Sequence, residues 1–328
     1  MKVVITGGGG FLGSRLCLNL LHHGALTGPS GGREPIDEII LFDAVFHCPA
    51  IDPRVRHVTG DISDRDTVFS VIGRDAATAI FHLASMVSGE CEERFDDALR
   101  VNLDGGRNVF EAARACVGQP RVVFASSIAC FGGEAMEPIN SDRTKLTPRT
   151  TYGMTKAICE LLVNDYSRKG HFDGRSARLP TVIIRPGKPN AAASSWASGM
   201  FREPLNGEPC ALPVRRDQCH PMTGYRTVID SLIALHEVPA TQLGDDRAIG
   251  LPAHRVTPAL AESVLREVAA SRNLKLGSIL EAFNPRIQGI VDNWPTAVDG
   301  GRAVRLGLPQ PPDLRQIIQD YLEDYGPR

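Results

Sequence analysis

Short apolar runs alternate with longer amphipathic stretches along the first two thirds of the chain. Strands are predicted at residues 2–5, 38–42, 54–58, 79–83, 121–125 and 181–185. The amphipathic stretches predict helices that include residues 11–21, 108–116 and 152–167. Strands that alternate regularly with helices are typical of an α/β fold built on a doubly wound parallel sheet.

This pattern changes after residue 185. Proline, alanine and serine dominate residues 186–199, and the alternation fades. Helices are still predicted at residues 228–236, after the N-cap pair Thr257-Pro258 and over residues 313–325. We therefore expect a large domain over residues 1–185 and a smaller α/β substrate-binding region over residues 186–328, with the helix near 226–238 packed back on the large domain. The turn formers of residues 24–35 predict a surface loop.

The first strand leads into a turn that contains four consecutive glycines, and a helix follows it. Two registers fit the turn, Gly7-x-x-Gly10-x-x-Gly13 and Gly8-x-Gly10-x-x-Gly13. Glycines let the backbone approach a pyrophosphate, and the N–H groups of the new helix favour its negative charge. Ser14-Arg15 replaces the Lys-Ser or Lys-Thr of a nucleotide triphosphatase loop. The turn predicts a Rossmann-type dinucleotide site, with a tight structural turn as the alternative.

Two aspartates follow the next strands of the predicted sheet. Asp43 ends the second strand, where a Rossmann fold meets the adenosine ribose. A carboxylate there accepts hydrogen bonds from the 2′ and 3′ hydroxyls and repels a 2′-phosphate, so Asp43 favours NAD over NADP. Asp61 and Ile62 follow the third strand, where a side chain and a backbone N–H are placed for the adenine edge. Both aspartates also fit ordinary turn positions.

The strongest chemical signal is Tyr152-Gly153-Met154-Thr155-Lys156. Residues four apart share a helix face, so Tyr152 and Lys156 point toward one cleft. A nearby ammonium stabilises phenolate and lowers the tyrosine pKa from its usual value of about 10. Ser127 ends a buried strand and is placed to hydrogen-bond a substrate oxygen. These three residues predict base catalysis beside a dinucleotide.

Composition narrows the class of protein. The 328 residues are 42% hydrophobic and 23% charged, with a net charge of −2, which gives no case for nucleic acid or a membrane as partner. The eight cysteines form no Cys-x-x-Cys pair, which suits reduced thiols in a cytoplasm. No cluster has metal-ligand spacing, so we expect no metal.

Taken together, these motifs resemble the extended short-chain dehydrogenase/reductase family, also described as NAD-dependent epimerase/dehydratases. The resemblance is carried by residues 6–13, 60–62, 81–85, 101–105 and 185–187, with Asp43, Ser126, Ser127, Tyr152 and Lys156. Residues 87–89, 161–168 and 179–195 look more narrowly like the D-erythronate dehydrogenase group of that family.

The resemblance implies oxidation of a four-carbon 2-hydroxy acid, D-erythronate or a related short-chain aldonate, at C2 with NAD. It implies a homodimer through the helices that contain Asn108 and Tyr152. It implies Ser127, Tyr152 and Lys156 as the catalytic set. The expected cofactor-binding residues are Gly7, Gly10, Phe11, Leu12, Gly13, Asp43, Asp61, Ile62, Leu83, Ala84, Asn102, Tyr152, Lys156 and Pro186.

The expected substrate-binding residues are Ser85, Ser127, Tyr152, Lys188, Asn190 and Arg226. Ser85 stands where many relatives have a second alanine. Lys188, held between a glycine and a proline, is the first candidate for the substrate carboxylate, and Arg226 is the second. Two other functions stay open. A nucleotide-sugar epimerase or dehydratase would retain its NAD, and a nucleotide-sensing regulator would need no base.

Overall fold

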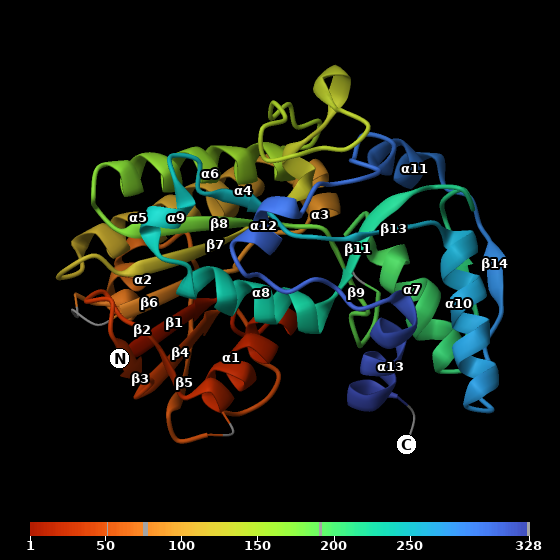
Figure 1. Ribbon diagram of the computed structural model, residues 1–328, viewed down its shortest axis with the longest axis horizontal. Coiled ribbons are helices and arrows are strands. Elements are labelled where there is room, and N and C mark those ends of the chain that lie inside the picture. Colours follow the sequence, from red (N-terminus) through yellow and green to blue (C-terminus); the bar gives the residue numbers. More distant parts are fainter. Residues whose placement is uncertain (51, 75–77, 190–191, 327–328) are drawn as a thin grey trace.

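The computed structural model describes residues 1–50, 52–74, 78–189 and 192–326. Its centre is a seven-stranded sheet in the order β12-β8-β7-β6-β1-β4-β5, with every neighbouring pair parallel (Figure 1). The strands are β1 (Lys2–Thr6), β4 (Glu38–Asp43), β5 (Val55–Thr59), β6 (Thr78–His82), β7 (Arg121–Ser127), β8 (Asp173–Leu179) and β12 (Ala248–Gly250). The predicted doubly wound α/β fold is confirmed.

Helices cover both faces of this sheet. Alternate residues of β1 explain why, since Val3 and Ile5 enter one buried cluster and Val4 enters another. The first cluster packs α1 (Phe11–His23) and α8 (Tyr225–Glu237) against the sheet. The second packs α2 (Arg65–Ile72), α5 (Gly105–Ala115) and α6 (Thr151–Arg168) against the opposite face. Helix α8 thus returns from the second half of the chain to the large sheet (Figure 1).

The predicted strand at residues 181–185 does not belong to the large sheet. That place is taken by β8, which the sequence analysis missed because it contains Asp173, Arg175 and Arg178. Arg175 and Arg178 are buried, and distant segments supply their partners, namely backbone carbonyls at the end of α8 for Arg175 and the Glu160 carboxylate for Arg178. No apolar pattern therefore marks the strand. Residues 181–183 instead form β9 (Thr181–Ile183) in a separate small sheet.

The expected surface loop at residues 24–35 also differs. It contains a two-stranded antiparallel hairpin formed by β2 (Ala25–Thr27) and β3 (Arg33–Pro35). Gly31 in its turn has φ +84°, a conformation that suits glycine. Short strands between turn formers leave little periodicity, which explains the missed hairpin.

The rest of the second half forms a smaller α/β layer with its own core, at the right in Figure 1. Its sheets are β13-β11-β9, with β11 (His220–Gly224) and β13 (His254–Val256), and β10 (Cys210–Leu212) with β14 (Ile279–Glu281). Helices α7 (Ser195–Leu205), α10 (Pro258–Ser271) and α13 (Leu314–Tyr325) pack around them. Thr257 caps α10 as predicted, and Asp313, expected as the first residue of the last helix, is the N-cap of α13.

Short elements complete the fold. They are α3 (Ser88–Glu93), α4 (Phe95–Ala98), a π-helical turn (Leu99–Asp104), two 3₁₀ turns (Ile128–Cys130 and Gly133–Ala135), α9 (Ala240–Leu243), α11 (Pro285–Val291) and α12 (Gly301–Arg305). None of the helices in the described part of the chain is long and apolar enough to cross a bilayer.

Candidate active site and cofactor cradle

The glycine turn between β1 and α1 leaves no room for side chains. Gly7 has φ +73°, and a Cβ there would lie 2.7 Å from the backbone nitrogen of Ala84. A Cβ on Gly13 would lie 2.2 Å from the Gly7 carbonyl oxygen. Gly10 is the N-cap of α1, and no side chain caps that end of the helix. The turn therefore keeps the N-terminus of α1 open for an anion, which fits the pyrophosphate of a dinucleotide.

Beside this turn, an open cavity of about 660 Å³ lies at the carboxyl ends of the strands. It is lined by eight of the predicted cofactor and substrate residues, namely Gly7, Gly10, Asp43, Asp61, Ile62, Leu83, Ala84 and Ser85. The Asp43 carboxylate accepts the N–H of Gly9 at 2.9 Å and the N–H of Ala44 at 2.7 Å, which fixes it at the rim. A carboxylate held there matches the ribose position of a Rossmann site.

Arg100 is a residue of this cavity that sequence reasoning missed. Its guanidinium donates to Asp61 at 2.6 Å, and Ser63 donates to the same carboxylate from its N–H and its hydroxyl. Burial acts to raise the pKa of Asp61, but these hydrogen bonds outweigh it and hold the pKa below its usual value. Nothing in a lone arginine of an amphipathic segment marks such a role.

Asn102 plays a different part from the one expected. It is buried, and its amide pairs with both backbone groups of Met86, accepting at 2.7 Å and donating at 3.3 Å. It does not line the cavity of Asp43. Since Met86 does line it, Asn102 fixes the loop that forms this wall.

Ser127, at the carboxyl end of β7, lies close to Tyr152 and Lys156, which belong to the first two turns of α6. Helix α6 starts where it does because the Thr150 hydroxyl accepts the Gly153 N–H at 3.1 Å. The Lys156 amine is buried, donates to the Ala125 carbonyl at 2.8 Å and lies 5.5 Å from the centre of the Tyr152 ring. The predicted shared helix face thus brings both side chains to one place.

Burial dominates the electrostatics of this trio. It lowers the pKa of Lys156 to about 8. It raises the pKa of Tyr152 above its usual value, and the hydrogen bond with Ser127 acts in the opposite direction. The Ser127 hydroxyl also accepts the Ala129 N–H at 3.1 Å, which fixes its position. A phenol in this place needs positive charge nearby before it can act as a base at neutral pH.

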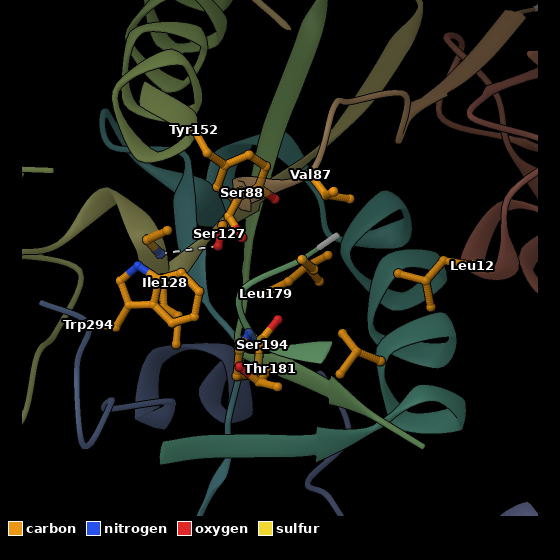
Figure 2. Close-up of a pocket in the computed structure, with 14 residues that line it drawn as sticks. Leu12, Val87, Ser88, Ser127, Ile128, Tyr152, Leu179, Thr181, Ser194 and Trp294 are labelled. Atoms are coloured by element: carbon orange, nitrogen blue, oxygen red, sulfur yellow. Dashed lines mark hydrogen bonds between the residues drawn. The ribbon is translucent and has the colours of Figure 1, made fainter. Parts of the chain in front are cut away.

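Tyr152 and Ser127 face a second cavity of about 230 Å³ (Figure 2). Figure 2 shows Tyr152 reaching in from its helix above Ser127, with Leu179, Thr181, Ser194 and Trp294 around the space. None of the described lining residues carries a charge. Leu12 of α1 lines this cavity rather than the one beside Asp43.

The two predicted carboxylate-binding cations do not line either of these cavities. Arg226 makes ion pairs with Asp320 at 2.9 Å, Glu323 at 3.1 Å and Asp324 at 2.9 Å, which commits its charge to α13. Lys188 is exposed, and its carbonyl accepts from Arg185 at 2.7 Å.

The remaining predicted residues are placed as follows. The rings of Phe11 and Tyr225 form an edge-type contact with their centres 5.2 Å apart. Neither Phe11 nor Pro186 lines either cavity. Asn190 lies outside the described residues.

Several lining residues of the small cavity were not predicted as site residues, and those with hydroxyl or indole groups are Ser88, Thr181, Ser194 and Trp294. They come from α3, β9, the start of α7 and the segment after α11. A serine or threonine at the end of an element is common, so only their convergence in space distinguishes them.

The model of the NAD-dependent epimerase/dehydratase family matches residues 3–222. The chain belongs to this family. Two curated relatives, both D-erythronate dehydrogenases, support the same assignment. The one from Cupriavidus necator is 42% identical over 99% of both chains, and the one from Haemophilus influenzae is 40% identical over 98% of this chain and 99% of its own.

Among solved structures, a nucleoside-diphosphate-sugar epimerase from Agrobacterium tumefaciens is 36% identical with a TM-score of 0.87, covering 99% of this chain and 94% of its own. An L-threonine dehydrogenase from Cupriavidus necator is 25% identical with a TM-score of 0.84, covering 99% of both chains. The family and the full-length relatives make this chain an NAD-dependent dehydrogenase. The expected cofactor and family are confirmed.

Proposed function

We propose that the protein oxidises D-erythronate, or a closely related short-chain 2-hydroxy aldonate, at C2 to the 2-oxo acid. Two relatives that match nearly the whole chain at 42% and 40% identity carry the name of that activity. The observation that carries the proposal is the small cavity of about 230 Å³ at Ser127 and Tyr152. Its size and its neutral described lining suit a short polyhydroxy acid.

Tyr152 accepts the proton of the C2 hydroxyl in this proposal, and Ser127 donates a hydrogen bond to the same oxygen. Lys156, one turn along α6, holds the positive charge that favours phenolate. NAD, when bound, supplies a positively charged ring that accepts the hydride from C2. Because Lys156 has a pKa of about 8, most of its charge is present at neutral pH. General-base catalysis of this kind contributes about 10²- to 10⁴-fold.

The cofactor is held by the glycine turn and Asp43. The turn excludes side chains where the pyrophosphate approaches, and the α1 N-terminus supplies N–H donors. The fixed Asp43 carboxylate accepts the ribose hydroxyls.

Neutral donors hold the substrate carboxylate in this proposal, in place of Lys188 or Arg226. Thr181 and Ser194 both line the cavity and carry hydroxyls that a carboxylate can use as donors. A single carboxylate beside neutral donors needs no buried cation, since part of the cavity stays open to solvent.

A nucleotide-sugar epimerase is the second candidate, because the solved structure of that description is 36% identical to this chain. Such a ligand carries a diphosphate, which calls for basic groups near the cavity. The described lining of the small cavity offers none, which favours the short acid.

Two further expectations belong to the proposal. We propose a homodimer through α5 and α6. Leu161 on α6 is 64% exposed in the single chain, and a second copy would cover this apolar side chain. We also propose a cytoplasmic setting, and all eight cysteines are free thiols, which suits a reducing compartment.

Tyr152→Phe tests the proposed base, because it removes only the phenolic oxygen. We expect kcat with D-erythronate to fall by about 10² or more while the Kd for NADH stays nearly unchanged. Lys156→Met is the companion variant and lowers both turnover and cofactor affinity. A Tyr152→Phe enzyme with near-normal kcat would show that another group takes the proton.

A further inference from the structure

A buried ion pair lies directly behind the catalytic residues. Glu160 is 2% exposed and Arg178 is 3% exposed. The Arg178 guanidinium donates through Nε to Glu160 Oε1 at 3.0 Å and through Nη2 to Oε2 at 2.8 Å, a two-pronged contact. The Ser126 hydroxyl, 1% exposed, donates to Glu160 Oε1 at 2.5 Å. None of the buried side-chain nitrogen and oxygen atoms of Ser126, Glu160 and Arg178 lacks a hydrogen-bond partner.

Each member of the cluster sits on an element that carries part of the site. Glu160 lies one turn after Lys156 and two turns after Tyr152 on α6. Ser126 directly precedes Ser127 at the end of β7. Arg178 is the last residue but one of β8 and directly precedes Leu179, which lines the small cavity together with Thr181. The cluster therefore joins the strand of the serine, the helix of the base and the wall that meets the substrate.

A second set of contacts holds Arg178 from the opposite side. Its guanidinium lies 5.2 Å from the centre of the Phe131 ring and 3.8 Å from the Asp142 carboxylate. Asp142 accepts the Gly250 N–H at 2.8 Å and pairs with Arg302 at 3.2 Å. The guanidinium is thus fixed on both sides, and rotation of Arg178 would break contacts on each.

We propose that Glu160, Arg178 and Ser126 form a positioning cluster for catalysis, which holds β7, α6 and β8 so that Ser127, Tyr152 and Lys156 face one substrate. None of the three touches the reacting atoms. Their effect on the reaction passes through Lys156 and through the register of the three elements. This inference rests on the proposed roles of Tyr152 and Lys156.

The charge of Glu160 adds an electrostatic effect. The groups that face the Lys156 amine are Tyr152, Cys159 and Glu160 of α6, Cys130 after β7, Cys91 of α3 and His82 of β6. Burial raises the pKa of each of the three thiols and lowers the pKa of His82 to about 3, so these groups are neutral near pH 7. Glu160 supplies negative charge that favours the protonated amine.

The test compares three variants of the full-length enzyme by steady-state kinetics with NAD and D-erythronate. Glu160→Gln is expected to lower kcat by roughly 10- to 100-fold, as small misplacements of reacting groups do, with the KM for NAD nearly unchanged. It also moves the alkaline limb of the kcat/KM profile to lower pH by about half a unit or more, because Lys156 loses a favourable charge. Arg178→Lys keeps the charge but loses the two-pronged contact, so kcat falls and the alkaline limb stays in place.

Glu160→Gln removes the charged two-pronged partner of Arg178, leaves it only the longer pair with Asp142, and so lowers stability by itself. The double variant Glu160→Gln/Arg178→Met removes both charges, which restores a buried neutral environment. We expect it to fold, to keep the low kcat and to keep the shifted alkaline limb. A folded double variant with the kcat and pH profile of the unmodified enzyme would overturn the proposal, as would an Arg178→Lys enzyme of normal kcat.

Asp173→Asn is the matched control. Asp173 pairs with the buried Arg175 on the same strand, β8, and Arg175 in turn contacts α8 instead of the site. We expect Asp173→Asn to lower stability and to leave kcat and the alkaline limb of the pH profile unchanged. Tyr152→Phe distinguishes a wrong base from a wrong positioning cluster. If that variant stays active, the proposed base is wrong; if it is inactive while the Glu160 variants are normal, only the positioning cluster is wrong.

Discussion

Replacement of Asp43 by serine tests how the enzyme selects its cofactor. The carboxylate is fixed by the N–H groups of Gly9 at 2.9 Å and Ala44 at 2.7 Å, and it lines the large cavity beside the glycine turn. Two ribose hydroxyls then donate to a charged acceptor, and each such hydrogen bond contributes about 1.5 to 3 kcal/mol. Serine keeps a single neutral oxygen. We therefore expect Asp43→Ser to lose about 2 to 3 kcal/mol of NADH binding, which is roughly a 30- to 150-fold rise in Kd.

The affinity for NADPH responds differently. Asp43 repels a 2′-phosphate in the unmodified enzyme, so its removal leaves the Kd for NADPH unchanged or lower. The ratio of the two Kd values, which measures the preference for NADH, therefore becomes smaller. Isothermal titration calorimetry with NADH and NADPH measures both values directly. Asp66→Ser, on the exposed first turn of α2, is the control and leaves both unchanged. An Asp43→Ser protein that binds NADH within about threefold of the unmodified protein would refute the ribose contact.

Two further predictions concern stability and substrate affinity. Arg175 is fully buried and donates to the carbonyls of Leu235 at 3.0 Å, His236 at 2.7 Å and Val238 at 3.0 Å. Arg175→Met therefore costs about 3 to 5 kcal/mol, seen as a lower urea midpoint, and a loss below about 1 kcal/mol would contradict the account. Thr181→Val raises the KM for D-erythronate, whereas Lys188→Ala, on an exposed residue, changes it little. The reverse order would return the carboxylate to Lys188.

The sequence predicted those parts of the fold whose signal is local. Tyr152 and Lys156 share a helix face by spacing alone, and the glycines before α1 mark the phosphate turn. Strand β8 was missed because Arg175 and Arg178 look like surface residues until their distant partners are known, the backbone carbonyls of Leu235, His236 and Val238 for Arg175 and Glu160 for Arg178. Burial of a charge depends on contacts between distant segments, which a local pattern does not contain.

The substrate side of the site was the hardest part to predict, for the same reason. Thr181, Ser194 and Trp294 meet around one cavity although they lie far apart along the chain. Arg226 was the second candidate for the substrate carboxylate, but α13 supplies three carboxylates that bind it. The family resemblance carried the chemistry of the large domain, and the lining of the small cavity needed the structure.

The most direct measurement of the central claim is the stoichiometry of NADH formation with purified enzyme. D-erythronate and excess NAD are expected to give one NADH for each 2-oxo acid formed, followed by absorbance at the NADH band and by chromatography of the product. UDP-glucose is expected to give neither product nor inhibition. Conversion of a UDP-sugar without net NADH, and no reaction with D-erythronate or related short aldonates, would contradict the dehydrogenase account and favour the epimerase.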